Sequence, residues 1–263
     1  MKKLLARLAD RLVLCSSTNF IDPEDRIRRE FPFDDGHLEI FECYRNEVEG
    51  APGLVVLKFP GTGGRAERAG PHPAELVNGY SKVVWTFNPA GYGGSSGRAS
   101  LQTLSRQCDA LMEHVTSCFP GWNILLTGNS LGCISALYLA ARHPVVGVYL
   151  RNPPPLAAMI SERQRYNWWN FGTARFVGDM VPGELDSVAN ARQCKVPCLF
   201  LQSGQDTVVP VEFQDRIIEA WQGEKFKFVI PGAEHHERVP EELADEYLNL
   251  MQEFFKTFLK GAK

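Results

Sequence analysis

One segment carries most of the information about the fold: Asn123-Ile124-Leu125-Leu126-Thr127-Gly128-Asn129-Ser130-Leu131-Gly132. Its apolar first half predicts a short buried strand, and residues 133–142 after it have a helical pattern. The form G-x-S-x-G joins the two. Gly128 and Gly132 lack a Cβ, so the strand and the helix can approach closely around Ser130. The segment therefore predicts a sharp strand-to-helix turn that raises a serine hydroxyl at the carboxyl end of a sheet.

The composition is typical of a soluble globular protein. The chain has 263 residues, of which 44% are hydrophobic and 22% are charged, and we expect one α/β domain over 1–263. A formal net charge of −3 argues against nucleic-acid binding, because no basic excess can neutralise phosphates. The seven cysteines include only one C-x3-C pair, Cys194 and Cys198. We therefore expect reduced thiols, no metal or other cofactor, and a cytoplasmic location.

The first residues, 1–14, predict a basic amphipathic helix. Leu4, Leu5, Leu8 and Leu12 share one helical face, opposite lysine and arginine residues. The charges at Arg7, Asp10 and Arg11 interrupt the apolar run, and no small-residue cleavage site follows, so the segment does not resemble a signal peptide. Two interpretations remain open: a helix packed on its own domain, or a weak contact with a membrane surface.

Strand and helix patterns alternate along the chain. Asp34-Asp35-Gly36 between two alternating segments predicts a hairpin at the start. Strands are predicted at 26–33, 37–44, 54–59, 83–87, 124–126, 145–150, 197–202 and 225–230, and helices at 101–118, 133–142, 211–222 and 240–260. This order predicts an α/β fold with a mostly parallel, doubly wound sheet of about eight strands and helices on both faces. The irregular, aromatic residues 151–193 are predicted to form a small lid insertion.

Three polar side chains follow predicted strands at their carboxyl ends: Ser130, Asp206 and His235. Carboxyl ends of parallel strands share one edge of a sheet, so these residues are expected to converge there. A histidine can accept the proton of a serine hydroxyl, and a carboxylate can hold the imidazole.

Other residues compete for two of these places. His236 is the rival for the histidine, and Asp179 and Asp186 in the irregular insertion are the rivals for the acid. The favoured histidine follows Gly-Ala-Glu at the end of the last strand, and the favoured acid stands between Ser-Gly-Gln and Thr-Val-Val-Pro. An acid in that place could also merely cap the following helix.

These motifs, with Gly232-Ala233-Glu234-His235 and the loop 88–95, resemble the α/β-hydrolase superfamily over nearly the whole chain. The chain order Ser…Asp…His is the order of that superfamily. The resemblance implies a Ser130–His235–Asp206 triad and an oxyanion hole made by the backbone N–H groups of Leu131 and Thr62.

The resulting hypothesis is a serine hydrolase that cleaves a carboxylic ester or thioester through an acyl-enzyme, with a small lipid-like acyl compound as substrate. Side chains expected to line the substrate pocket are Tyr92, Met159, Trp168, Trp169 and Phe171. A serine aminopeptidase or amidase is an alternative, in which Glu162, Asp179 or Glu184 would bind a substrate ammonium. Acyl transfer and a non-catalytic binding protein of the same fold are further alternatives.

Overall fold

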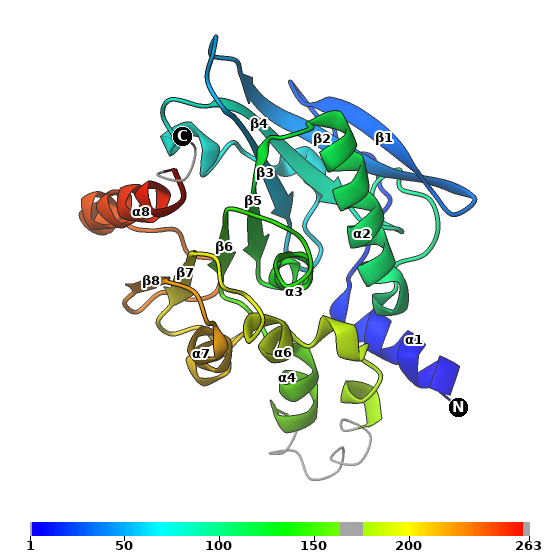
Figure 1. The fold of residues 1–263 in the computed structure, drawn as a ribbon. Helices are drawn as coiled ribbons and strands as arrows, with labels where there is room; N and C mark the ends of the chain where they lie inside the picture. Colours follow the sequence, from blue (N-terminus) through cyan, green and yellow to red (C-terminus); the bar gives the residue numbers. More distant parts are fainter. Residues whose placement is uncertain (1, 164–175, 260–263) are drawn as a thin grey trace.

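The computed structural model of the chain describes residues 2–163 and 176–259 (Figure 1). Its strands form one sheet in the order β1-β2-β4-β3-β5-β6-β7-β8. The strands are β1 (Ile27–Phe33), β2 (Gly36–Asn46), β3 (Gly53–Phe59), β4 (Ser81–Asn88), β5 (Asn123–Asn129), β6 (Gly147–Arg151), β7 (Cys198–Ser203) and β8 (Lys225–Ile230). Strands β3 to β8 are parallel, and β2 is antiparallel to both of its neighbours. The predicted mostly parallel, eight-stranded sheet is confirmed.

Helices cover both faces of the sheet (Figure 1). The α-helices are α1 (Lys2–Val13), α2 (Leu101–Cys118), α3 (Gly132–Ala140), α4 (Leu156–Arg163), α6 (Ser187–Ala191), α7 (Val211–Ala220) and α8 (Ala244–Leu259). Val55 and Leu57 of β3 pack in the core that contains α2, α3 and α7. Leu54 and Val56 point the other way, into the core under α8. A central strand covered on both faces needs apolar residues at successive positions, which explains the apolar run from Leu54 to Leu57 in β3.

The predicted hairpin is present at the edge of the sheet. Strands β1 and β2 pair antiparallel from Phe33 opposite Gly36 to Ile27 opposite Glu42. The predicted insertion 151–193 has its described part in α4, a 3-10 turn (Gly183–Leu185) and α6, and α6 packs against α3 and α7. Its last part therefore belongs to the body of the domain, and a lid role for the rest stays a prediction.

Helix α1 packs on the domain through its C-terminal half. Ala9 and Val13 are buried, and Asp10 accepts a hydrogen bond from the backbone N–H of Leu101 (2.8 Å) at the start of α2. In contrast, Leu4 is 71% exposed and Leu8 is 39% exposed. The helix thus combines a docked end with an exposed apolar end. Across residues 2–163 and 176–259, no helix has the length and apolar character needed to cross a membrane.

Candidate active site

The turn after β5 has the predicted sharp geometry. Ser130 has a φ of +50°, and its backbone N–H donates to the carbonyl of Arg151 at 2.8 Å. A Cβ on Gly128 would lie 2.5 Å from the backbone of α3. A Cβ on Gly132 would lie 2.0 Å from the carbonyl oxygen at the end of β3. Only glycine fits at these two places, so the G-x-S-x-G spacing is a consequence of how closely β5, α3 and β3 approach.

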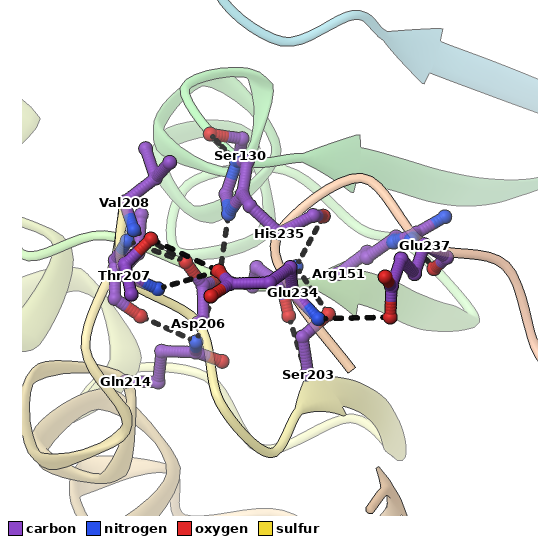
Figure 2. Close-up of polar contacts among 12 residues, drawn as sticks. Ser130, Arg151, Ser203, Asp206, Thr207, Val208, Gln214, Glu234, His235 and Glu237 are labelled. Atoms are coloured by element: carbon purple, nitrogen blue, oxygen red, sulfur yellow. Dashed lines mark hydrogen bonds and ion pairs between the residues drawn. The ribbon is translucent and has the colours of Figure 1, made fainter. Parts of the chain in front are cut away.

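The structure brings Ser130, Asp206 and His235 together (Figure 2). The His235 Nε2 lies 2.9 Å from the Ser130 Oγ, and its Nδ1 lies 2.6 Å from the Asp206 Oδ2. All three are at least nine-tenths buried, so little water competes for these hydrogen bonds. The imidazole is therefore placed to accept the serine proton while the carboxylate stabilises the cation that forms.

Both oxygens of the Asp206 carboxylate are held. Its Oδ1 accepts the backbone N–H groups of Val208 (2.9 Å) and Val209 (2.7 Å). Its Oδ2 accepts from the Gln214 side-chain amide (3.2 Å) as well as from His235. These bonds fix the plane of the carboxylate, which in turn fixes the imidazole.

The rival residues do not hydrogen-bond to Ser130 or His235, although His236 also lines the cavity beside Ser130. Asp186 accepts the backbone N–H groups of Val188 and Ala189 and caps the start of α6, and Asp179 is exposed. His236 is exposed, and its ring packs against the edge of the His235 ring at 4.7 Å between centroids. Neither rival acid hydrogen-bonds to His235, and His236 does not hydrogen-bond to Ser130 or Asp206.

Asn152 is a residue of this region that the sequence analysis missed. Its side-chain amide donates to the His235 carbonyl (3.0 Å) and to the Ser203 Oγ (3.0 Å), and it accepts the Ser203 backbone N–H (2.8 Å). It is fully buried with a φ of +48°. Asn152 thus ties the His235 loop to the ends of β6 and β7. An asparagine after a strand and before prolines was the available signal, because asparagine tolerates the left-handed region.

A cavity of about 720 Å³ opens beside Ser130 and His235. Thr62, Leu131 and Met159 line it, and their roles as oxyanion donors and substrate contact stay predictions. Its other side chains are the apolar Val13, Pro154, Leu156, Ile160, Val208 and Val209, together with Asn129 and His236. The cavity is therefore suited to an uncharged, hydrophobic group next to the serine.

The four remaining pocket predictions fail or lie outside the described residues. Tyr92 is buried in the core, and its hydroxyl donates to the carbonyl of Leu14, so it does not reach the Ser130 cavity. The prediction was wrong because the residues after α1 fold back over this tyrosine. Trp168, Trp169 and Phe171 lie outside the described residues.

The acids proposed for an aminopeptidase are not brought to the described lining of the cavity. Both oxygens of Glu162 bond to the Arg216 guanidinium at 2.8 Å. Glu184 accepts a hydrogen bond from the Ser105 hydroxyl (3.1 Å), and Asp179 is exposed. These carboxylates thus have other partners or face solvent.

Two buried cysteines, Cys133 and Cys108, have thiols that stay neutral. Cys133 follows the turn and is fully buried, and burial raises the pKa of its thiol well above the ordinary value. Burial also raises the pKa of Cys108 to about 12. A neutral thiol is a poor nucleophile, so Ser130 is a better candidate for the nucleophile than these cysteines. Within the described ranges, no group of three or more histidine, cysteine or acidic side chains could hold a metal ion.

Comparisons with known proteins agree with this architecture. No family model matches the chain. An uncharacterized protein of Mycobacterium tuberculosis is 29% identical over 197 residues, which are 74% of this chain and 67% of that protein. Lipid droplet hydrolase 1 of Saccharomyces cerevisiae is 25% identical over 197 residues, which are 65% of this chain and 52% of the yeast protein.

Solved structures show the fold. An esterase of Pyrococcus furiosus superposes with a TM-score of 0.65 at 17% identity, covering 94% of this chain and 97% of the esterase. An acylaminoacyl peptidase of Pyrococcus horikoshii superposes with a TM-score of 0.66 at 16% identity, covering 89% of this chain and 42% of the peptidase. The chain has the α/β-hydrolase fold, as its motifs indicated.

Proposed function

We propose that this chain is a serine hydrolase that cleaves a carboxylic ester or thioester through an acyl-enzyme on Ser130. The observation that carries the proposal is the hydrogen-bonded series Ser130–His235–Asp206, with contacts of 2.9 and 2.6 Å. A binding protein has no need for a serine, a base and a buried carboxylate in this arrangement, whereas acyl transfer to water needs all three.

In the proposed reaction, His235 takes the proton of the Ser130 hydroxyl as its Oγ attacks the acyl carbon. The carbonyl oxygen becomes an oxyanion, which the backbone N–H groups of Thr62 and Leu131 stabilise. His235 then returns the proton to the leaving alcohol or thiol, and an acyl-Ser130 ester remains. A water molecule attacks this ester with His235 again as base, and the carboxylic acid leaves.

The lining of the Ser130 cavity supports a hydrophobic acyl group. Leu156, Met159 and Ile160 come from α4 and its start, and Val208 and Val209 follow Asp206. Burying a short alkyl chain against such side chains stabilises it by about 0.8 kcal/mol per methylene. The similarity to a yeast lipid droplet hydrolase agrees with a lipid-like substrate.

The exposed end of α1 supports contact with a lipid surface as part of the same proposal. Leu4 and Leu8 are exposed on a helix that also exposes Arg7 and Arg11, while Val13 of this helix lines the Ser130 cavity. An apolar face flanked by arginines suits an anionic membrane surface. We expect Leu4→Glu combined with Leu8→Glu to weaken flotation with phosphatidylserine vesicles while activity on a water-soluble ester persists. Unchanged flotation would contradict this part of the proposal.

A fluorophosphonate probe tests the nucleophile. Wild-type protein is expected to label and Ser130→Ala is expected not to label. The Ser203→Ala variant is the matched control, because this serine also lies at the carboxyl end of a strand but bonds to Asn152 instead of His235. An unlabelled wild type, or equal labelling of Ser130→Ala, would refute the assignment of Ser130 as the nucleophile.

A series of p-nitrophenyl esters then tests the acyl group. A preference for acetyl over butyryl and hexanoyl would contradict a lipid-like substrate.

A further inference from the structure

A second chamber lies next to the Ser130 cavity, on the α8 face of the sheet. Its volume is about 350 Å³. Gly61, Gly64 and Asn129 line both cavities, so the two are separated by little more than the 60–64 turn and the end of β5. An extended molecule bound at Ser130 is therefore close enough to reach the chamber.

The floor of the chamber is a row of polar side chains across four neighbouring strands. Lys58 of β3 pairs with Thr86 of β4 on one side and with Thr127 of β5 on the other. Thr127 in turn pairs with Tyr149 of β6, and all four residues line the chamber. Such central positions in a sheet covered on both faces are ordinarily apolar. Burying polar groups there is costly unless they have polar partners. The Tyr149 hydroxyl has one in the Tyr247 hydroxyl (3.1 Å), whereas the buried Thr86 Oγ1 has none within residues 2–163 and 176–259, which points to a polar occupant.

The charge of the chamber is positive. Lys58, Arg68 and Arg151 line it, and none of its described lining residues is an aspartate or a glutamate. Lys58 donates to the backbone carbonyls of Gly70 (2.7 Å) and His72 (2.5 Å), which leaves one of its three N–H groups for another partner. A fourth cation, Arg65, also lines the chamber but is paired with Glu67.

Arg151, which lines the chamber, has a guanidinium N–H group without a hydrogen-bond partner in the described part of the chain. One terminal nitrogen of its guanidinium donates to the Glu237 carbonyl, seen beside the His235 loop in Figure 2. Its Nε is buried and has no hydrogen-bond partner among the described residues. A buried guanidinium donor without a partner is costly, and carboxylate and phosphate oxygens are the acceptors that fit an arginine best. Burial also lowers the pKa of Lys58, and a nearby anion would favour its charged form again.

We propose that this chamber binds an anionic group, a carboxylate or a phosphate, carried by the ester that Ser130 cleaves. The inference rests on the proposed function, because it assigns the substrate class of that site. The acyl chain lies in the apolar Ser130 cavity, and the anion lies between Lys58, Arg68 and Arg151. Arg68 lines the chamber and is exposed to solvent.

Two matched pairs of substrates test the proposal. Monobutyryl glycerol is compared with monobutyryl glycerol phosphate, and ethyl butyrate with butyryloxyacetate, so that both anionic members carry the charge on the alcohol side of the ester. Acid release is followed in a pH-stat. Wild-type kcat/KM is expected to be at least tenfold higher for the anionic member of a pair. Arg151→Gln and the exposed Arg68→Gln are each expected to bring this ratio toward one, because a charge-assisted contact is worth roughly ten- to a hundredfold in affinity. Arg98→Gln, an exposed arginine outside the chamber, is expected to keep the ratio.

Inorganic phosphate separates the sources of the anion. It is expected to inhibit hydrolysis of the anionic esters competitively and to spare the neutral esters. Equal kcat/KM within both pairs, or a preference that survives both arginine substitutions, would overturn the proposal. Equal inhibition of neutral and anionic esters would overturn the assignment to substrate in favour of a free-anion site. If no ester is hydrolysed but Arg151→Gln raises the Kd for phosphate at least tenfold, the proposed function fails and the anion site stands.

Discussion

Replacing Asp206 by asparagine tests the proposed role of this carboxylate with little change of shape. The Oδ1 of Asp206 accepts two backbone N–H groups, from Val208 and Val209. The carbonyl oxygen of an asparagine must take this place, because its NH₂ group there would face two donors. The NH₂ group is then directed at His235 Nδ1, where the carboxylate oxygen now lies at 2.6 Å.

This orientation places the proton on the wrong nitrogen of the imidazole. Nδ1 has to accept a hydrogen bond from the amide, so the neutral ring carries its proton on Nε2, which faces the Ser130 Oγ at 2.9 Å. A protonated Nε2 cannot take the serine proton. The imidazolium also loses its anionic partner. Together these effects are expected to lower kcat by about 10⁴, which corresponds to roughly 5 kcal/mol of transition-state stabilisation.

The assay is steady-state hydrolysis of p-nitrophenyl butyrate, with the rate of fluorophosphonate labelling as a second measure of the nucleophile. Asp186→Asn is the matched control, since Asp186 also accepts the N–H groups two and three residues ahead of it but lies at the start of α6. Both variants are expected to stay folded, because the backbone hydrogen bonds persist, although Asp206→Asn also loses the hydrogen bond from the Gln214 amide. Activity of Asp206→Asn within tenfold of wild type, or an equal loss in Asp186→Asn, would refute the reasoning.

Three further substitutions probe the base, the turn and the fold. His235→Ala is expected to lower kcat at least a thousandfold while His236→Ala keeps most of it, and comparable losses in steady-state assays would contradict the choice between them. Gly132→Ala places a Cβ 2.0 Å from a backbone oxygen and is expected to lower the thermal midpoint by roughly 6–12 °C, whereas Gly70→Ala, with open space around it, should leave it unchanged in calorimetry. Burial disfavours the charged form of Glu42, but hydrogen bonds and charges from arginines and the hydrogen bond from an indole outweigh it and lower the pKa of Glu42 from 4.5 to about 2. The charged Glu42 therefore stabilises the folded protein fully above pH 4.5, and this stabilisation is lost as the pH falls toward 2. Glu42→Gln is therefore expected to lower the free energy of unfolding by about 2 kcal/mol at pH 7 and by less at pH 3, and an equal loss in urea denaturation at both would contradict this.

The sequence predicted the sheet and the converging residues because both depend on local patterns. Apolar runs and the turn chemistry around Ser130 can be recognised without knowing what lies opposite. The meeting of this serine with Asp206 and His235 then follows from one general property, the shared carboxyl edge of parallel strands. The sequence could also separate Asp206 from Asp186, although both accept backbone N–H groups in the same way, because only the former follows a strand.

The missed or mistaken residues depend on long-range contacts that no local pattern shows. Tyr92 stands in a glycine-rich loop that is typical of a site, but it is buried because the carbonyl of Leu14, 78 residues earlier, accepts its hydroxyl. Asn152 gains its place from Ser203 and His235, which come from two other strand ends. Such contacts become visible only when the register and the connections of the sheet are known.

The same reason explains why the positively charged chamber was not predicted. Lys58 interrupts an otherwise apolar strand, and a single lysine in a strand does not by itself predict a binding site. The site can be recognised only from the register, which places Thr86 and Thr127 beside Lys58, and from β6, which contributes Arg151 to the same chamber. The 60–64 turn then stands between this polar row and the Ser130 cavity. Under the proposal, a substrate with one apolar and one anionic end would fill both cavities at once, and its specificity would come from the two sides of the turn together.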